Sequence, residues 1–171
     1  VLDGRGRHES SWASQFTEDG SKLLVSGGDG ALRLWELRIE DDRDALESLE
    51  GPVGGLAVSA DGQWIASTGY DEVVRIWDSD TGNQMLEFPL DTNGSAVSFN
   101  QDASRVVAAD EDGNLSIWDV SSLTNRVANI QFTEFAHEAR FAPPGDYLIV
   151  ITDDYKVWSI PSGDILQIKD G

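Results

Sequence analysis

The sequence predicts an all-β fold built from four consecutive copies of one small antiparallel sheet. Tryptophan recurs at positions 35, 77, 118 and 158, in steps of 42, 41 and 40 residues. An aspartate stands six residues before each of the first three of these tryptophans, and β-forming residues lie between them. Asp-Gly dipeptides, which favour tight turns, punctuate the chain. Regular repetition of strands and turns therefore defines the fold class.

The octet at residues 71–78 shows the repeated unit most clearly. It opens with two acids, continues with β-formers and ends in Trp77-Asp78. Strand alternation predicts that Val74 and Ile76 point to one side of a strand and Trp77 to the other. Residues 29–36 and 112–119 repeat the pattern, and 153–159 repeat it with one residue fewer between aspartate and tryptophan.

Each repeat is predicted to contain strands separated by short turns. In the first repeat we expect strands at 11–17, 22–26 and 31–36. The charged run at 38–44 is expected to be a solvated loop, with a short helix at 42–49 as the alternative. The strands expected in the later repeats are 54–59, 63–67, 73–78 and 84–88; 95–100, 105–109, 114–119 and 126–132; and 136–142, 147–151, 156–159 and 164–168.

A period of about 40–45 residues with a Trp-Asp signature is typical of a four-stranded propeller blade. On these residues the chain resembles the WD40-repeat β-propeller family over almost its whole length. The resemblance implies four four-stranded antiparallel blades that form an arc of a larger propeller. The expected blades are about 5–50, 51–91, 92–133 and 134–171. Because terminal blades of such an arc have uncovered faces, self-association through them is also expected.

The resemblance further implies a structural set of residues in each blade. In this family a tryptophan, an aspartate, a serine or threonine and a histidine form a hydrogen-bonded group. The positions that match the set are Trp35, Asp29 and His8 in the first blade; Trp77 and Asp71 in the second; Trp118 and Asp112 in the third; and Trp158, with the offset Asp153, in the fourth. The histidine position of the second blade falls near Pro52, so the set is incomplete there.

Four further residues are candidates for a partner-binding rim. His137 aligns with Trp12 at the start of the first strand of a repeat, while Tyr70 and Glu111 directly precede turn aspartates. The family resemblance places these positions near the mouth of the central channel. An aromatic residue, a tryptophan, a histidine and an acid on one rim would form a contact patch. The alternative is scattered rim residues with no shared partner.

Composition excludes several classes of partner and chemistry. The net charge is −19, from 31 acids and 12 bases, which argues against nucleic acid or anionic membranes as partners. The chain has no cysteine, only two histidines and no nucleophile motif, so we expect no catalytic site, no metal and no cofactor. The acids at 110–112 or 153–154 could hold Ca²⁺, but loop acids are the preferred interpretation.

The function that the resemblance implies is a non-catalytic, cytoplasmic scaffold that binds protein or peptide partners. The alternative is a regulatory propeller domain of a larger signalling protein, with a catalytic domain elsewhere in that protein. A self-contained propeller enzyme would need a set of channel acids that occurs once and is not repeated, and no such set is evident. Fold alone does not decide among these functions.

Overall fold

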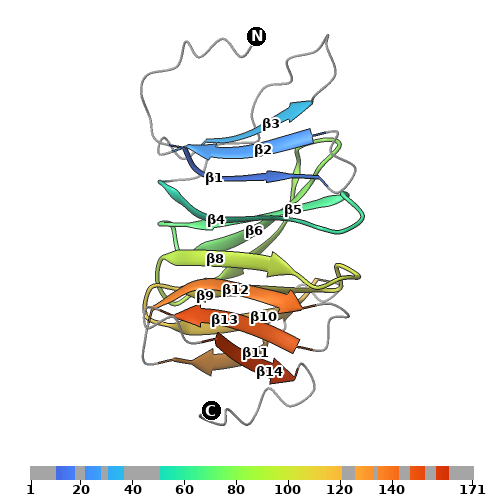
Figure 1. Cartoon of the computed structure of the whole chain (residues 1–171). Helices are drawn as coiled ribbons and strands as arrows, with labels where there is room; N and C mark the ends of the chain where they lie inside the picture. Colours follow the sequence, from blue (N-terminus) through green and yellow to red (C-terminus); the bar gives the residue numbers. More distant parts are fainter. Residues whose placement is uncertain are drawn as a thin grey trace.

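In the computed structural model, residues 11–17, 22–27, 31–36, 51–120, 126–132, 135–142, 147–152 and 157–161 are described. These residues form fourteen β-strands and contain no helix. The strands make four antiparallel sheets that follow one another along the chain, and the sheets are stacked from the N-terminal to the C-terminal end (Figure 1). The chain is therefore all-β, as the repeats predict.

Two of the sheets have four strands. Sheet two contains β4 (Val53–Val58), β5 (Trp64–Gly69), β6 (Val73–Asp78) and β7 (Gln84–Pro89). Sheet three contains β8 (Gly94–Phe99), β9 (Arg105–Asp110), β10 (Asn114–Asp119) and β11 (Arg126–Gln131). In both sheets each strand pairs with the next one in the sequence.

Three strands are described in each of the outer two sheets. Sheet one contains β1 (Ser11–Phe16), β2 (Lys22–Gly27) and β3 (Leu32–Glu36). Sheet four contains β12 (Ala136–Ala142), β13 (Tyr147–Thr152) and β14 (Val157–Pro161). The predicted strand at 164–168 and the charged run at 38–44, with its helical alternative, lie outside the described residues.

The strand predictions agree with the described strands to within two residues at each end. The agreement arises because turn residues fix the strand ends. Ser59, for example, accepts a hydrogen bond from the Trp64 backbone N–H (2.9 Å) and donates one to Asp61, closing the turn between β4 and β5. The blade boundaries that were expected between the sheets remain a prediction.

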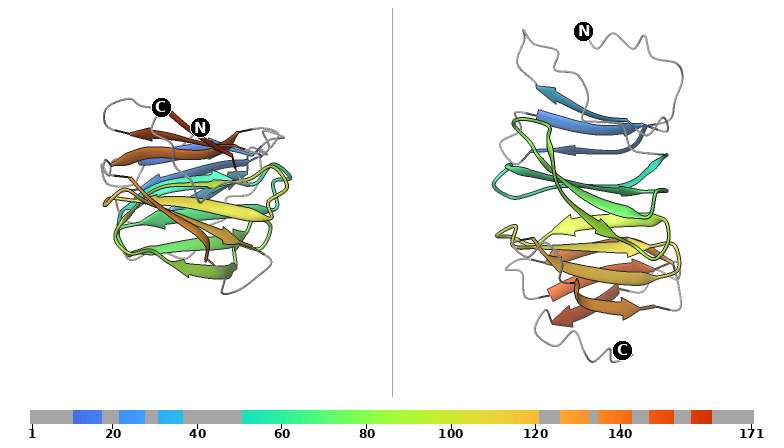
Figure 2. Two further views of the ribbon diagram at one scale, coloured as in Figure 1. Left: turned by 90° about the horizontal axis from the view of Figure 1, so that it is seen from below. Right: turned by 180° about the vertical axis from the view of Figure 1, so that it is seen from behind.

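The sheets pack face to face like consecutive blades of a propeller arc. The first strand of each sheet lies beside the first strand of the next one: β1 against β4, β4 against β8, and β8 against β12. The view from behind in Figure 2 shows sheets one and four at opposite ends of the stack. The first strands thus form a continuous inner wall, to which the other strands of each sheet are attached.

A hydrophobic core fills each space between neighbouring sheets. The core between sheets two and three contains Val74, Ile76 and Phe88, while Trp77, on the opposite face of β6, joins the core with Leu24 and Leu32 of sheet one. The predicted alternation along β6 is therefore confirmed. Because both faces of the sheet are covered, both sets of side chains are buried.

Candidate functional site

Tyr70 and Glu111 meet at the boundary between sheets two and three. Tyr70 lies in the turn after β5 and is 43% exposed, and its hydroxyl donates a hydrogen bond to the Glu111 carboxylate. That hydrogen bond and the nearby negative charge raise the pKa of Tyr70 above its ordinary value. Two of the four predicted rim residues are thus joined directly, although they come from different repeats.

Asn93 fixes Glu111 in this arrangement. Its side-chain amide donates to Glu111 Oε2 at 3.0 Å, and its backbone carbonyl accepts the Glu111 N–H at 2.9 Å. Asn93 lies in the connection from β7 to β8, and sequence reasoning missed it because an Asn-Gly dipeptide reads simply as a turn. We call Tyr70, Asn93 and Glu111 the rim triad.

The other two rim candidates occupy equivalent places in the strand pairing. In all four sheets the register shifts once near the start of the first strand, and this β-bulge contains Trp12, Gly54, Ser95 or His137. The predicted alignment of His137 with Trp12 therefore has a backbone basis. His137 is exposed and its ring packs edge-on against Phe135, with centroids 4.7 Å apart. The side chain of Trp12 lies outside the described part of the chain.

In sheet two the signature tryptophan has a hydrogen-bond partner. Trp77 is 1% exposed, and its indole Nε1 donates to Ser67 Oγ at 2.9 Å. Asp71 forms an ion pair with Arg75, four residues further on. Its other carboxylate oxygen, Oδ1, is buried and has no hydrogen-bond partner among the residues that the structure describes. In the family set a histidine would stand nearby, and here that position falls near Pro52.

In sheet three the buried carboxylate belongs to Asp110, whereas the predicted set contains Asp112. Asp112 is exposed, whereas Asp110 is 1% exposed. Asp110 accepts hydrogen bonds from the backbone N–H of Asp112 (3.1 Å) and of Asn114 (2.9 Å), and from the Asn114 amide. The spacing to Trp118 selected Asp112, but the end of β9 holds Asp110 inside. The acidic run at 110–112 includes Asp110, but the sequence of this run does not indicate which of its three acids is buried.

The register of sheet four differs from that of the other sheets. Trp35, Trp77 and Trp118 each pair with the second residue of the preceding strand, namely Leu23, Ile65 and Val106. In sheet four the second residue, Leu148, pairs with Ile160, and Trp158 pairs with Val150. Trp158 is therefore two residues away from the position that the strand register of the other sheets predicts, and Ile160 occupies that position.

The remaining members of the predicted blade set are not described. His8, Asp29 and Asp153 lie outside the described residues, and the side chains of Trp35 and Trp158 lie outside them too. The residues that are described contain no group of three or more His, Asp or Glu side chains placed to hold a metal ion. None of them forms a helix that could span a membrane.

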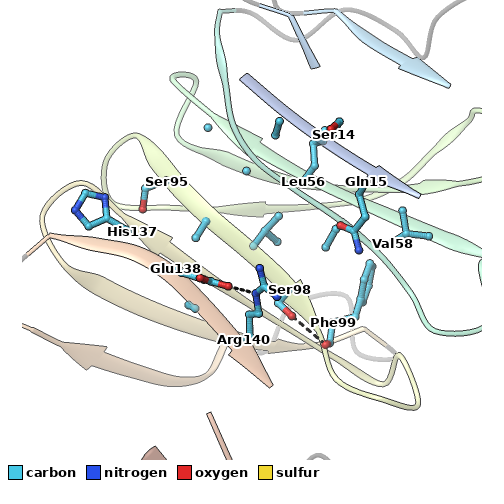
Figure 3. Close-up of a pocket in the computed structure, with 17 residues that line it drawn as sticks. Ser14, Gln15, Leu56, Val58, Ser95, Ser98, Phe99, His137, Glu138 and Arg140 are labelled. Atoms are coloured by element: carbon cyan, nitrogen blue, oxygen red, sulfur yellow. Dashed lines mark hydrogen bonds and ion pairs between the residues drawn. The ribbon is translucent and has the colours of Figure 1, made fainter. Parts of the chain in front are cut away.

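A groove of about 680 Å³ runs along the inner wall formed by the first strands. All four sheets contribute to it through β1, β4, β8 and β12, and Figure 3 shows their side chains converging. His137 lies at one end of this groove, while Glu138, Arg140 and Ser98 lie further along it. The sequence did not single out Glu138 or Arg140, because neither belongs to a repeated pattern.

Comparison with known proteins identifies the family. The model of the family described as "WD domain, G-beta repeat" matches residues 7–36, 44–78 and 89–119, which is more than half of the chain. The chain belongs to the WD40-repeat family. Each matched segment ends just after a signature tryptophan, at Glu36, Asp78 or Asp119. The matches stop before sheet four, where the tryptophan has a different register.

Several curated WD-repeat proteins are similar to the chain. A rice protein named small ribosomal subunit protein RACK1y is 30% identical over 70% of this chain and 36% of its own length. An Arabidopsis WD repeat-containing protein WDS homolog is 26% identical over 85% of this chain and 29% of its own length. Rat apoptotic protease-activating factor 1 is 26% identical over 86% of this chain and 13% of its own length.

The chain spans only between about a tenth and just over a third of the length of the relatives that it matches, from 10% to 36%. Because the matched family and relatives are WD-repeat proteins, the similarity supports a general role in protein interaction. It does not extend to the whole of any relative.

Proposed function

We propose that the chain is a non-catalytic interaction platform that binds a protein or peptide partner at its rim. The observation that carries the proposal is the rim triad. An exposed aromatic ring is held in place by Glu111, and Glu111 is held in turn by Asn93. A fixed aromatic side chain loses little conformational entropy on binding, which is why tyrosine is common at interface hot spots.

Two further observations support the same role. His137, at the β-bulge in the first strand of sheet four, adds a second exposed ring. Trp12 occupies the same bulge position in the first strand of sheet one. The net charge of −19 favours a protein partner over a nucleic acid or an anionic membrane. The cytoplasm is the proposed location, since the name of one relative places it in the small ribosomal subunit.

A second candidate is a regulatory propeller domain within a larger multidomain protein. The observation in its favour is the similarity to rat apoptotic protease-activating factor 1, of which the matched region is 13%. In that case the platform would bind a partner or signal, and any catalysis would lie in another domain. Sequencing the gene on both sides of the chain distinguishes the two, because a catalytic motif there favours the second candidate.

Self-association through the outer faces of sheets one and four is also proposed. Among the described residues, sheets one and four each pack against one other sheet, and heterologous contacts between their opposite faces could close two copies into a ring. Light scattering on a sizing column tests this idea directly. A defined dimer supports it, whereas a monodisperse monomer contradicts it.

Rim binding is tested with peptides selected from a random display library against the wild-type chain. Tyr70→Ala and Trp12→Ala are each expected to weaken binding of the selected peptides by at least about tenfold, as at interface hot spots. Tyr147→Ala is the matched control, because Tyr147 is 46% exposed and begins β13, at the strand end away from the turn that holds Tyr70. Equal binding to both rim variants and the wild type would contradict the proposal.

A further inference from the structure

The rim triad contains an asparagine that is followed by a glycine. Asn93 precedes Gly94, whereas every other asparagine of the sequence is followed by Gln, Leu, Arg or Ile. Glycine has no side chain to hinder the approach of its backbone nitrogen to a neighbouring group. The side-chain amide of Asn93 is therefore the one in the sequence that is most open to attack by the next backbone nitrogen, a reaction that makes asparagine chemically labile.

Packing fixes the glycine of this dipeptide. A Cβ added at Gly94 would lie 1.9 Å from Thr68 Oγ1 and 2.9 Å from Leu90 Cδ1, so a larger residue does not fit there. The labile dipeptide can be avoided only by a different residue at position 93.

The repeat itself does not require an asparagine at position 93. The Asn93 backbone carbonyl accepts the Glu111 N–H at 2.9 Å, and in sheet two the Pro52 carbonyl accepts the Tyr70 N–H in the same way at 3.1 Å. Proline has no side-chain amide, so this backbone contact forms without one. What Asn93 adds is the side-chain hydrogen bond to Glu111 Oε2. The asparagine is therefore specific to the rim triad.

The strand pairing favours the Gly94 nitrogen as a nucleophile. Because the Asn93 carbonyl accepts the Glu111 N–H, the next pair, Gly94 with Asp110, is of the kind whose N–H groups point away from the partner strand. When the Gly94 nitrogen loses its proton, negative charge spreads to the Asn93 carbonyl oxygen, and the Glu111 N–H stabilises that charge. Asn93 is only partly buried, so water reaches it.

We propose that Asn93 is a deamidation site and that its reaction opens the rim triad. The inference rests on the proposed function, to which it adds an irreversible regulation. The Gly94 nitrogen attacks Asn93 Cγ, the bond from Cγ to the side-chain nitrogen breaks, and ammonia leaves with the proton from the Gly94 nitrogen. Water then opens one of the two C–N bonds of the cyclic imide, which leaves aspartate or isoaspartate at position 93. No oxidant or reductant takes part.

The product opposes Glu111 instead of holding it. The Asn93 Nδ2 donor lies 3.0 Å from Glu111 Oε2, and a carboxylate takes its place. Two carboxylates this close repel each other, so Glu111 either moves away or takes up a proton. Tyr70 donates its hydroxyl hydrogen bond to the same carboxylate of Glu111. The exposed aromatic ring therefore loses its fixed position.

Peptide mass spectrometry of the chain after incubation at mildly alkaline pH tests the chemical step. Position 93 is expected to exchange NH₂ for OH at least about tenfold faster than Asn83, because glycine leaves the attacking nitrogen unhindered. Asn83 is the internal control, since it is exposed, lies in the turn before β7 and precedes Gln84. Asn93→Gln, which would need a larger ring, should show no mass gain at this position. Equal rates at Asn93 and Asn83 would overturn the proposal.

Two charge variants test the opening of the triad. Asn93→Asp places the product's carboxylate at the rim, whereas Asn83→Asp adds the same charge at the opposite end of β7. Asn93→Asp is expected to shift the NMR signals of the Glu111 N–H and the Tyr70 ring, and Asn83→Asp is expected to leave them in place. The proposal is overturned if the two variants give the same Tyr70 and Glu111 signals.

Binding of the rim-selected peptides separates this inference from the proposed function. Asn93→Asp and the deamidated chain, isolated by ion exchange, should bind them at least about tenfold more weakly than Asn83→Asp does. If the peptides require Tyr70 but bind Asn93→Asp and Asn83→Asp equally, the regulation fails and the rim proposal stands. If no peptide requires the rim residues, the rim proposal fails, while the mass and NMR measurements still decide whether Asn93 reacts and opens the triad.

Discussion

Sheets two and three place a tryptophan at the same register position and hold it by different contacts. Trp77 donates to Ser67 and packs against Leu24 of sheet one. Trp118 stacks on Phe88 of sheet two, with ring centroids 5.4 Å apart. The residue equivalent to Ser67 in sheet three is Ala108, which offers no hydroxyl.

The surroundings of Trp118 supply other contacts instead. The Arg126 guanidinium lies 5.6 Å from the centre of its ring, and the same side chain donates to the Pro89 carbonyl of sheet two at 3.0 Å. Both tryptophans are nevertheless almost fully buried. The register position therefore determines burial between sheets, while local residues determine which polar or aromatic partner the tryptophan has.

The largest effect is expected from removing either tryptophan. Trp77→Ala and Trp118→Ala should each destabilise the chain by about 3–5 kcal/mol, because each leaves a cavity between two sheets. Urea unfolding followed by circular dichroism measures the loss. A loss below about 1 kcal/mol for either variant would show that its sheet interface can collapse around the missing ring.

A smaller effect is expected from the hydrogen bond that distinguishes the two sheets. Ser67→Ala leaves the buried Trp77 indole N–H without its acceptor and should cost about 1–3 kcal/mol. The matched variant is Ala108→Ser, which introduces the hydroxyl at the equivalent position of sheet three. Because no existing hydrogen bond is broken there, Ala108→Ser should lower the free energy of unfolding in urea by less than Ser67→Ala does. A larger loss for Ala108→Ser would show that the Trp77–Ser67 hydrogen bond does not distinguish the stability of the two sheets.

The smallest effect concerns Tyr70, which joins the two sheets at the rim. Its pKa is raised by the hydrogen bond to Glu111, so the stabilisation of its neutral form is fully present below the ordinary tyrosine value of about 10. That stabilisation is lost as the pH rises through the folded value. Because Tyr70 is substantially exposed, solvent screening keeps the contribution to stability small.

The measurement is a tyrosinate absorbance titration of the wild type, Tyr70→Phe and Glu111→Gln. Subtracting the Tyr70→Phe curve isolates Tyr70 among the three tyrosines of the chain. Its midpoint should lie above the ordinary value in the wild type and fall towards it in Glu111→Gln. An unchanged midpoint in Glu111→Gln would mean that the rim triad does not control Tyr70.

The sequence by itself determined the all-β class, the repeat and nearly all the described strand positions. These features follow from local chemistry, namely strand alternation and turn residues such as Asp61 and Gly62, which act over a few residues. The family also followed from the sequence, because the Trp-Asp spacing is a local signal repeated along the chain.

Tertiary structure alone decided which side chains meet. The burial of Asp110 rather than Asp112, the shift that puts Ile160 opposite Leu148, and the joining of Tyr70 with Glu111 depend on how strands from different repeats pair and pack. Contacts between residues far apart in the chain are set by packing geometry, and periodicity carries no information about them.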